Sequence, residues 1–183
     1  MKKLIAIAAI LTSAFAANAQ NASSSATQTV NLALSNALEI TFTGSTSATG
    51  TAVTLNFTTV NDYANGVQSA AQELKVRSNK NFTVAVKSNS ANFSYSGTTS
   101  PAPTMPVSGV LGIKLSANAT SGTVGSTFST TAFNTLSNTN ADLITNCTKG
   151  GAQTFSVMYQ ATPGFSYPAG TYTTDVVYTA TQL

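Results

Sequence analysis

Histidine and tryptophan are absent from this 183-residue sequence, cysteine occurs once, and charged residues make up only 7% of it. Without histidine there is no imidazole base, which excludes a Ser-His-Asp triad and any histidine-ligated metal site. A single cysteine excludes a zinc cluster and a disulfide within the chain. The sequence therefore lacks much of the chemistry on which enzymes depend.

Threonine, serine and asparagine are abundant instead, with 31, 22 and 16 residues respectively. The apolar fraction of 42% is that of a globular domain, which argues against a charged, disordered chain. The few acids are scattered, so neither the facing carboxylates of a glycosidase nor a metal-binding cluster is expected. We predict a non-catalytic protein that needs no cofactor. The acids are Glu39, Asp62, Glu73, Asp142 and Asp175.

The N-terminus has the layout of a secretory signal peptide. Two lysines form a positive start, residues 4–15 are apolar, and Ala17 and Ala19 place small residues before a cleavage site. The apolar stretch is too short to cross about 30 Å of hydrocarbon as a helix. We therefore expect removal of residues 1–19 and export to the periplasm, the cell surface or the extracellular space.

The remaining residues, 20–183, carry six Lys or Arg against five Asp or Glu, a net charge of +1. This balance lacks the broad basic field with which proteins attract nucleic acid. No second apolar stretch reaches the roughly 18 residues of a membrane-spanning helix. We expect neither a nucleic-acid partner nor a transmembrane span in this part of the chain.

Apolar and polar residues alternate with a period of two through most of residues 20–183, and no stretch keeps a helical period. Turn-forming residues bound each run. One apolar and one polar face per strand is typical of antiparallel sheets packed over one core. We predict an all-β fold, an immunoglobulin-like antiparallel β-sandwich over residues 36–183, after an N-terminal signal peptide helix. The expected strands include 30–34, 38–42, 53–57, 74–76, 82–86, 93–95, 111–115 and 155–159.

Three polar regions allow separate structural predictions. Asp62, with Asn61 and Asn65, offers oxygens to calcium, but an isolated acid makes a weak site and an Asx-type turn is favoured. Cys147 is available to pair with another chain or to lie buried, and burial is favoured. Residues 116–140 predict long loops with short edge strands.

Four residues are candidates for ligand binding. Phe165 and Tyr167 lie in the connection 163–170, where aromatic rings either stack on a sugar or clamp the loop. Lys75 and Arg77 share the solvated face of a predicted strand. These residues support an alternative function, a secreted carbohydrate- or matrix-binding β-sandwich module.

The last fourteen residues resemble the final strand of chaperone–usher pilus subunits. That family has a glycine at the position of Gly170, followed by alternating apolar residues. The departure is Gln182, because the family usually has an aromatic residue at the penultimate position. The resemblance implies a terminal assembly strand and a periplasmic chaperone as a partner. The strand residues that share the parity of Gly170 are Tyr172, Val176, Tyr178 and Ala180.

The N-terminal segment 20–35 is similar to pilins of the alternate chaperone–usher class and to spore-coat-U-like secreted proteins. Val30, Leu32 and Leu34 alternate with polar or small residues before a break that precedes the run at 38–42. In such pilins the first segment is a donor strand that completes a neighbour's incomplete sandwich. The resemblance implies a fimbrial, surface-filament or extracellular-layer subunit that pairs with copies of itself or with a related surface subunit.

The sequence leaves open whether the Val30–Leu34 run pairs within its own sheet or with a neighbour. A donated strand supplies backbone hydrogen bonds to a free sheet edge and places every second side chain in a groove. Burial of each apolar side chain contributes roughly 1.5–3 kcal/mol. We predict a secreted structural protein that assembles by β-strand complementation.

Overall fold

A computed structural model describes residues 23–44 and 48–183 of the chain. The predicted signal peptide, residues 1–19, lies outside the described residues. The described part contains one short helix, α1 (Val60–Asn65), and is otherwise built from strands. In chain order the strands are β1 (Leu38–Phe42), β2 (Val67–Gln68), β3 (Gln72–Ser78), β4 (Phe82–Ser88), β5 (Ser94–Ser96), β6 (Leu111–Asn118), β7 (Thr123–Val124), β8 (Asn134–Thr135), β9 (Ala141–Cys147), β10 (Gly150–Ala161), β11 (Thr171–Thr173) and β12 (Val176–Gln182).

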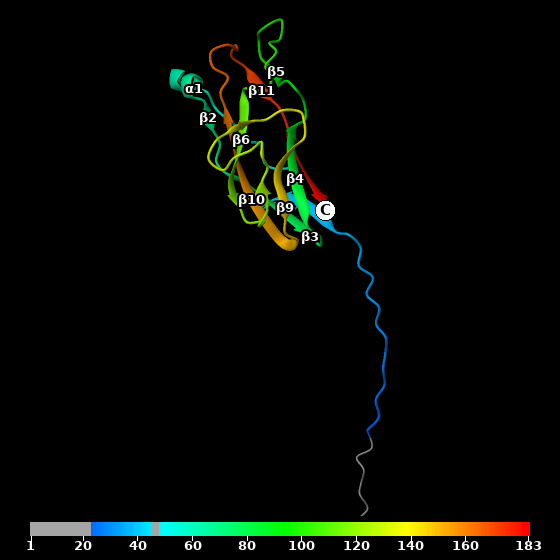
Figure 1. Cartoon of the computed structure of the whole chain (residues 1–183). Coiled ribbons are helices and arrows are strands. Elements are labelled where there is room, and N and C mark those ends of the chain that lie inside the picture. The colour runs from blue at the N-terminus through cyan, green and yellow to red at the C-terminus, as the bar shows by residue number, and fades with distance from the viewer. Residues whose placement is uncertain (1–22, 45–47) are drawn as a thin grey trace, which may run out of the picture. The chain divides into compact units, whose positions relative to one another are not determined.

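Two antiparallel sheets form the body of residues 35–183 (Figure 1). The larger sheet has the order β1-β3-β10-β6-β8, with β2 paired to β10, and the smaller has the order β12-β4-β9-β7. A separate two-stranded ribbon joins β5 to β11. The predicted all-β antiparallel sandwich is confirmed.

The core between the sheets is formed by every second side chain of the central strands, those that face inward. Phe82, Val84 and Val86 of β4 are fully buried, which confirms that they share one face of their strand. From the other sheet, Phe155 contributes a buried ring. Cys147 is free and buried in this core, as expected, and burial raises the pKa of its thiol.

The expected strand at 53–57 is not formed. The backbone of residues 50–57 makes no hydrogen bond to any described residue, although Leu55 and Phe57 pack against the core. The alternation therefore reports correctly which side chains turn inward, but a strand also needs a neighbour to pair with. The run at 30–34 likewise lies outside any strand.

Helix α1 was not expected, and it begins with a capping box. The Thr59 hydroxyl accepts from the Asp62 N–H, while the Asp62 carboxylate accepts from the N–H groups of Thr58 and Thr59 at 2.8 and 2.7 Å. The backbone bond from Thr59, followed by that from Thr58, lowers the pKa of Asp62. The carboxylate considered for calcium is thus held in this cap. Gly66 ends the helix at a φ of 77°, where a Cβ would lie 2.6 Å from the Ala161 carbonyl oxygen.

Each sheet has one long edge and one very short edge. β7 and β8 are two residues each, and residues 116–140 around them form the expected loops. The opposite edges are β1, with five residues, and β12, with seven. β1 and β12 lie beside one another but exchange no backbone hydrogen bond among the described residues. The sandwich is therefore open along β1 and β12.

A hydrogen bond between two phenols ties β12 to the opposite sheet. The Tyr178 hydroxyl lies 2.6 Å from that of Tyr159 on β10. The Tyr178 ring also contacts Phe42 and Phe155, each with a centroid distance of 6.3 Å. Burial, and then the neighbouring Tyr159, raises the pKa of Tyr178 well above 10.0. Burial also raises the pKa of Tyr159, against a smaller lowering by the hydrogen bond from Tyr178.

This pair predicts a loss of stability at alkaline pH. Because both pKa values are raised on folding, their contribution is present below the unfolded value near 10.0 and declines as the pH rises above it. We expect Tyr159 and Tyr178 to ionise only above the ordinary pH range of a tyrosine, together with unfolding. Tyrosinate absorbance and circular dichroism, recorded in parallel against pH, measure both events.

The double variant Tyr159→Phe/Tyr178→Phe is the matched control, because it removes both hydroxyls without leaving one unpaired. Its alkaline unfolding midpoint should move to higher pH. Ionisation of Tyr159 and Tyr178 near pH 10, with the fold intact, would contradict the assignment.

Candidate functional site

The apolar side chains along the open side of the sandwich are only partly buried, whereas those of the central strands are fully buried. They come from β1, from the unpaired segment 50–57 and from β12, and we call this set the seam. Partly covered apolar side chains beside a free sheet edge are typical of a surface that binds a partner. The seam consists of Ile40, Phe42, Leu55, Phe57, Val176, Tyr178 and Ala180.

The backbone along the seam also has groups without a hydrogen-bond partner among the described residues. β12 pairs with β4 along its whole length, and no strand of the described residues pairs with its other side. The segment 50–57 has no backbone hydrogen bond to any part of the chain that the structure describes. Free N–H and C=O groups in a row are the template on which an added strand pairs.

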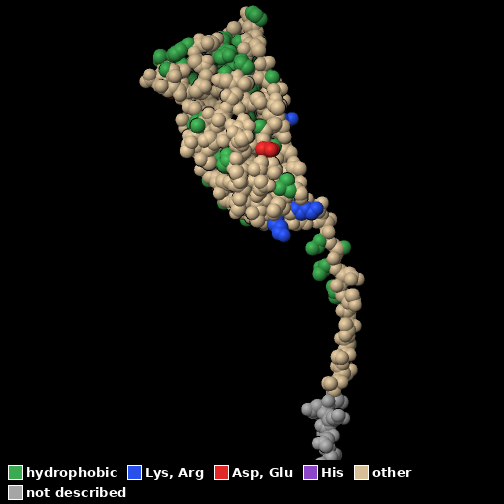
Figure 2. Space-filling view, viewed as in Figure 1, with side chains coloured by type: hydrophobic (Ala, Val, Ile, Leu, Met, Phe, Trp, Pro, Cys, Tyr) green, Lys and Arg blue, Asp and Glu red, His purple; other side chains and the backbone are tan. Residues whose placement is uncertain are grey.

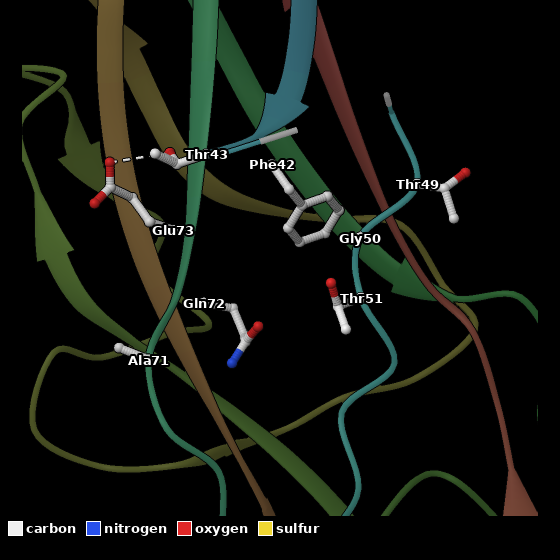
Figure 3. Close-up of a pocket in the computed structure, with 9 residues that line it drawn as sticks. Phe42, Thr43, Thr49, Gly50, Thr51, Ala71, Gln72 and Glu73 are labelled. Atoms are coloured by element: carbon white, nitrogen blue, oxygen red, sulfur yellow. Dashed lines mark hydrogen bonds between the residues drawn. The ribbon is translucent and has the colours of Figure 1, made fainter. Parts of the chain in front are cut away.

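A cavity of about 480 Å³ opens where β1 ends. Figure 3 shows the Phe42 ring directed toward the segment that carries Gly50 and Thr51, with Glu73 on the other side. A Cβ at Gly50 would lie 2.9 Å from the Phe42 ring, so glycine permits this close approach. The Glu73 carboxylate accepts a hydrogen bond of 3.0 Å from the Thr43 hydroxyl. Among the described residues that line the cavity, Glu73 is the only one with a carboxylate, so they hold no facing pair of the glycosidase type.

Two asparagine side chains hold the chain where the edge strands begin. The Asn79 amide donates to the Ser35 carbonyl at 2.8 Å and accepts from the Ala37 N–H at 2.9 Å. Asn89 accepts from the Asp175 N–H at 3.2 Å and donates to the Asp175 carboxylate at 2.7 Å. We call these contacts the Asn79 clip and the Asn89 clip. They fix the entry of the chain into β1 and into β12 respectively.

The clips come from a short internal repeat, Val-Arg-Ser-Asn at 76–79 and Val-Lys-Ser-Asn at 86–89. In each copy the serine hydroxyl donates to the carbonyl two residues later, at 2.6 Å from Ser78 and 2.7 Å from Ser88. This bond closes the turn and leaves the asparagine side chain free to reach a neighbouring strand. The repeat is the sequence signal for these site residues, which are not among the residues predicted from the sequence to be functional.

Gln182 joins the end of β12 to the start of β1. Its side-chain amide donates toward the Ala37 carbonyl at 2.9 Å and toward Ser78 Oγ and Asn79 Oδ1 at 3.1 Å each. Two amide protons serve three acceptors, so one is shared. A polar side chain thus stands where the chaperone–usher family usually has an aromatic one, and here it connects the two edge strands.

The predicted terminal assembly strand is divided in two. Tyr172 lies in β11, whereas Val176, Tyr178 and Ala180 lie on the inward face of β12. The division falls at Asp175, which the Asn89 clip holds. Gly170 precedes β11, and a Cβ there would collide with the Tyr95 ring.

The predicted donor residues are highly exposed. The side chains of Val30, Leu32 and Leu34 are 74%, 84% and 88% exposed. The described residues up to Leu34 belong to a separate unit from residues 35–183. Large apolar side chains left in water at alternate positions are unfavourable unless a partner covers them.

The structure does not bring the four ligand candidates together. Lys75 and Arg77 lie on β3, where Arg77 Nε is 3.5 Å from a carboxylate oxygen of Glu39 and both side chains are about half exposed. Phe165 and Tyr167 lie in the connection between β10 and β11, and Phe165 is 69% exposed. Any ligand site therefore uses the aromatic pair or the cationic pair, not both.

Comparison with protein-family models gives no match, and a search of curated proteins finds no relative. Within residues 23–44 and 48–183 there is no group of three or more acidic or cysteine side chains that could hold a metal ion. The one helix described there is too short to cross a membrane.

Reciprocal substitutions test the two clips. Asn79→Ala should accelerate amide hydrogen exchange in residues 35–41 and leave residues 174–178 unchanged, and Asn89→Ala should do the reverse. Each lost hydrogen bond contributes about 0.5–1.5 kcal/mol, so local exchange should accelerate roughly two- to tenfold per bond. Mass-spectrometric exchange on peptides from both regions measures this. Equal acceleration of both regions in either variant would indicate global destabilisation instead of a local clip.

Proposed function

We propose that this protein is an exported, non-catalytic structural subunit of a surface filament or extracellular layer, and that its copies assemble by β-strand complementation. One observation carries the proposal: the chain contains both parts of the interaction. The exposed run at Val30–Leu34 has the alternation of an inserted strand, and the seam combines a free strand edge with partly covered apolar side chains.

Stable association requires both apolar burial and backbone hydrogen bonds. Covering three apolar side chains contributes roughly 1.5–3 kcal/mol each. Association costs about 4–15 kcal/mol in lost translational and rotational freedom. Apolar burial alone therefore barely offsets this cost. The hydrogen bonds along the seven residues of β12 and along segment 50–57 supply what remains.

Donation to a second copy is favoured over insertion into the chain's own seam. Leu34 is followed directly by Ser35, and Ala37 comes two residues later. The Asn79 clip holds both residues, and Gln182 also holds Ala37. A strand that folds back beside β1 needs a tight hairpin at residues 35–37. Two-residue hairpin turns need positive φ angles, and none of these residues has one. Self-insertion would break the clip, whereas insertion into another copy leaves it intact.

Head-to-tail donation of this kind is heterologous, because the donor of one copy meets the seam of the next. Such contacts continue without closing and build a filament or a layer. Before a neighbour arrives, the free edge is a site of non-specific association. A periplasmic chaperone that covers the seam is therefore the expected transient partner, and a related surface subunit is the expected alternative to a second copy.

Substitutions at neighbouring positions of the donor segment, whose side chains face opposite sides of the strand, test the proposal. Leu32→Asp places a charge at the central inserted position and should abolish assembly, because burial of an unpaired carboxylate is strongly unfavourable. Ala33→Asp introduces the same charge at the opposite parity and should assemble like the unsubstituted chain. Size-exclusion chromatography and electron microscopy of both variants measure the outcome. Assembly of both variants, or of neither, would refute a strand inserted with this parity.

A mixing experiment separates donation between copies from self-insertion. Ala180→Arg blocks the seam and leaves the donor intact, whereas Leu32→Asp keeps the seam and disables the donor. Each variant alone should stay monomeric, and an equimolar mixture should give a discrete one-to-one dimer. A mixture that stays monomeric, while both variants remain folded by circular dichroism, would contradict exchange between copies.

A further inference from the structure

Figure 1 shows α1, β5 and β11 at the same end of the sandwich, and this end carries most of the aromatic ring contacts. Figure 2 shows hydrophobic side chains at the surface of this end. They form two groups of rings in contact. The outer stack is Phe57, Tyr63 and Phe165, and the tyrosine cluster is Tyr95, Tyr167 and Tyr172.

The outer stack presents one ring to solvent on a fixed base. Phe57 packs against the core, and its ring centroid lies 5.4 Å from that of Tyr63 on α1. The Phe165 ring stacks on Tyr63 at 5.7 Å, with an angle of 23° between the ring planes. Phe165 remains 69% exposed in spite of this contact. The outward face of the Phe165 ring is therefore a flat apolar platform, and Tyr63 and Phe57 connect the ring to the core.

The tyrosine cluster holds the loop that carries this platform. The Tyr95 hydroxyl donates to the Ala169 carbonyl at 3.1 Å, and the Tyr172 hydroxyl donates to the Pro168 carbonyl at 2.9 Å. The Tyr95 and Tyr172 rings lie 5.0 Å apart. The clamp and ligand roles considered for this connection are therefore compatible, because the cluster fixes the loop and Phe165 faces outward.

The surroundings of the platform are uncharged and rich in hydroxyl groups. Residues 88–113 and 150–174 contain no Asp, Glu, Lys or Arg. The Asp62 carboxylate on α1 is engaged in the capping box. The hydroxyls of Tyr63 and Tyr167 make no hydrogen bond to another described residue, so they are available to a ligand. An ionic ligand finds no partner here, whereas a ligand with apolar C–H faces and many hydroxyls finds both kinds of contact.

We propose that this end of the protein binds a neutral polysaccharide. The C–H face of a pyranose ring stacks on Phe165, and the Tyr63 and Tyr167 hydroxyls bond to sugar hydroxyls. The residues proposed to contact the sugar, Phe165, Tyr63 and Tyr167, lie outside the seam, and only Phe57 beneath them belongs to both.

The test uses the processed full chain and its Phe165→Ala and Phe165→Trp variants. The probes are insoluble cellulose, starch, β-1,3-glucan, chitin and mannan, with heparin and phosphatidylcholine vesicles as charged and lipid comparisons. We expect binding to at least one neutral polysaccharide, little change between low and high salt, and a loss of roughly tenfold in Phe165→Ala. Phe133→Ala, on a partly exposed ring that contacts Lys114, is the matched control and should bind normally.

Phe165→Trp gives a second readout, because the chain has no other tryptophan. It should retain binding, and its fluorescence emission should shift to shorter wavelength when soluble oligosaccharide of the bound polymer is added. Failure to bind any neutral polysaccharide, full binding by Phe165→Ala, or binding to heparin or vesicles alone would each overturn the proposal. Thermal unfolding of all variants shows that the fold is retained, since Phe165 is mostly exposed.

Discussion

A β-strand at the edge of a sheet has backbone groups that must find hydrogen-bond partners, in water, in a neighbouring strand or in another molecule. The rest of this structure is arranged around that requirement. On one side of the sandwich the edge strands are only two residues long and loops adjoin them, so few backbone groups are left unpaired. The other side keeps a seven-residue strand, β12, and an unpaired segment, 50–57. The same side holds apolar side chains that are only partly covered.

Local hydrogen bonds, not further strands, fix the borders of the open side. The repeated Ser-Asn turns position one edge strand each, and Gln182 connects the two edges through side-chain contacts. The Tyr159–Tyr178 bond holds β12 to the opposite sheet from within the core. Together these contacts keep β1 and β12 in place without pairing them, so the edge stays rigid as well as free. A rigid acceptor loses less conformational entropy on binding than a flexible one.

The sequence was most informative where structure depends on single positions and their parity. The shared face of Phe82, Val84 and Val86 and the burial of Cys147 could be predicted, because alternation reports which side chains turn inward. The absence of a strand at Val53–Phe57 could not be predicted. Its apolar residues alternate as in a strand, but no neighbouring strand among the described residues pairs with it. Helix α1 is six residues long, too short to show a helical period, and only its capping box marks it.

The candidate site could be predicted in part for a related reason. The exposed apolar run at Val30–Leu34 and the inward face of β12 are visible as patterns. Which strands become edges, and which side chains beside them stay half covered, depends on strand order in the assembled sheets. Asn79 and Gln182 are ordinary polar residues until the fold brings residues 35–37 between them.

The Asn79 clip also determines how the protein would carry mechanical load. Leu34 is joined to Ser35 without any slack, and the contacts at Ser35 and Ala37 reach the turn between β3 and β4 as well as the last residues of β12. Tension applied to the leading segment therefore enters both sheets at once instead of peeling β1 away one residue at a time. A sandwich pulled in this manner resists extension with its whole framework.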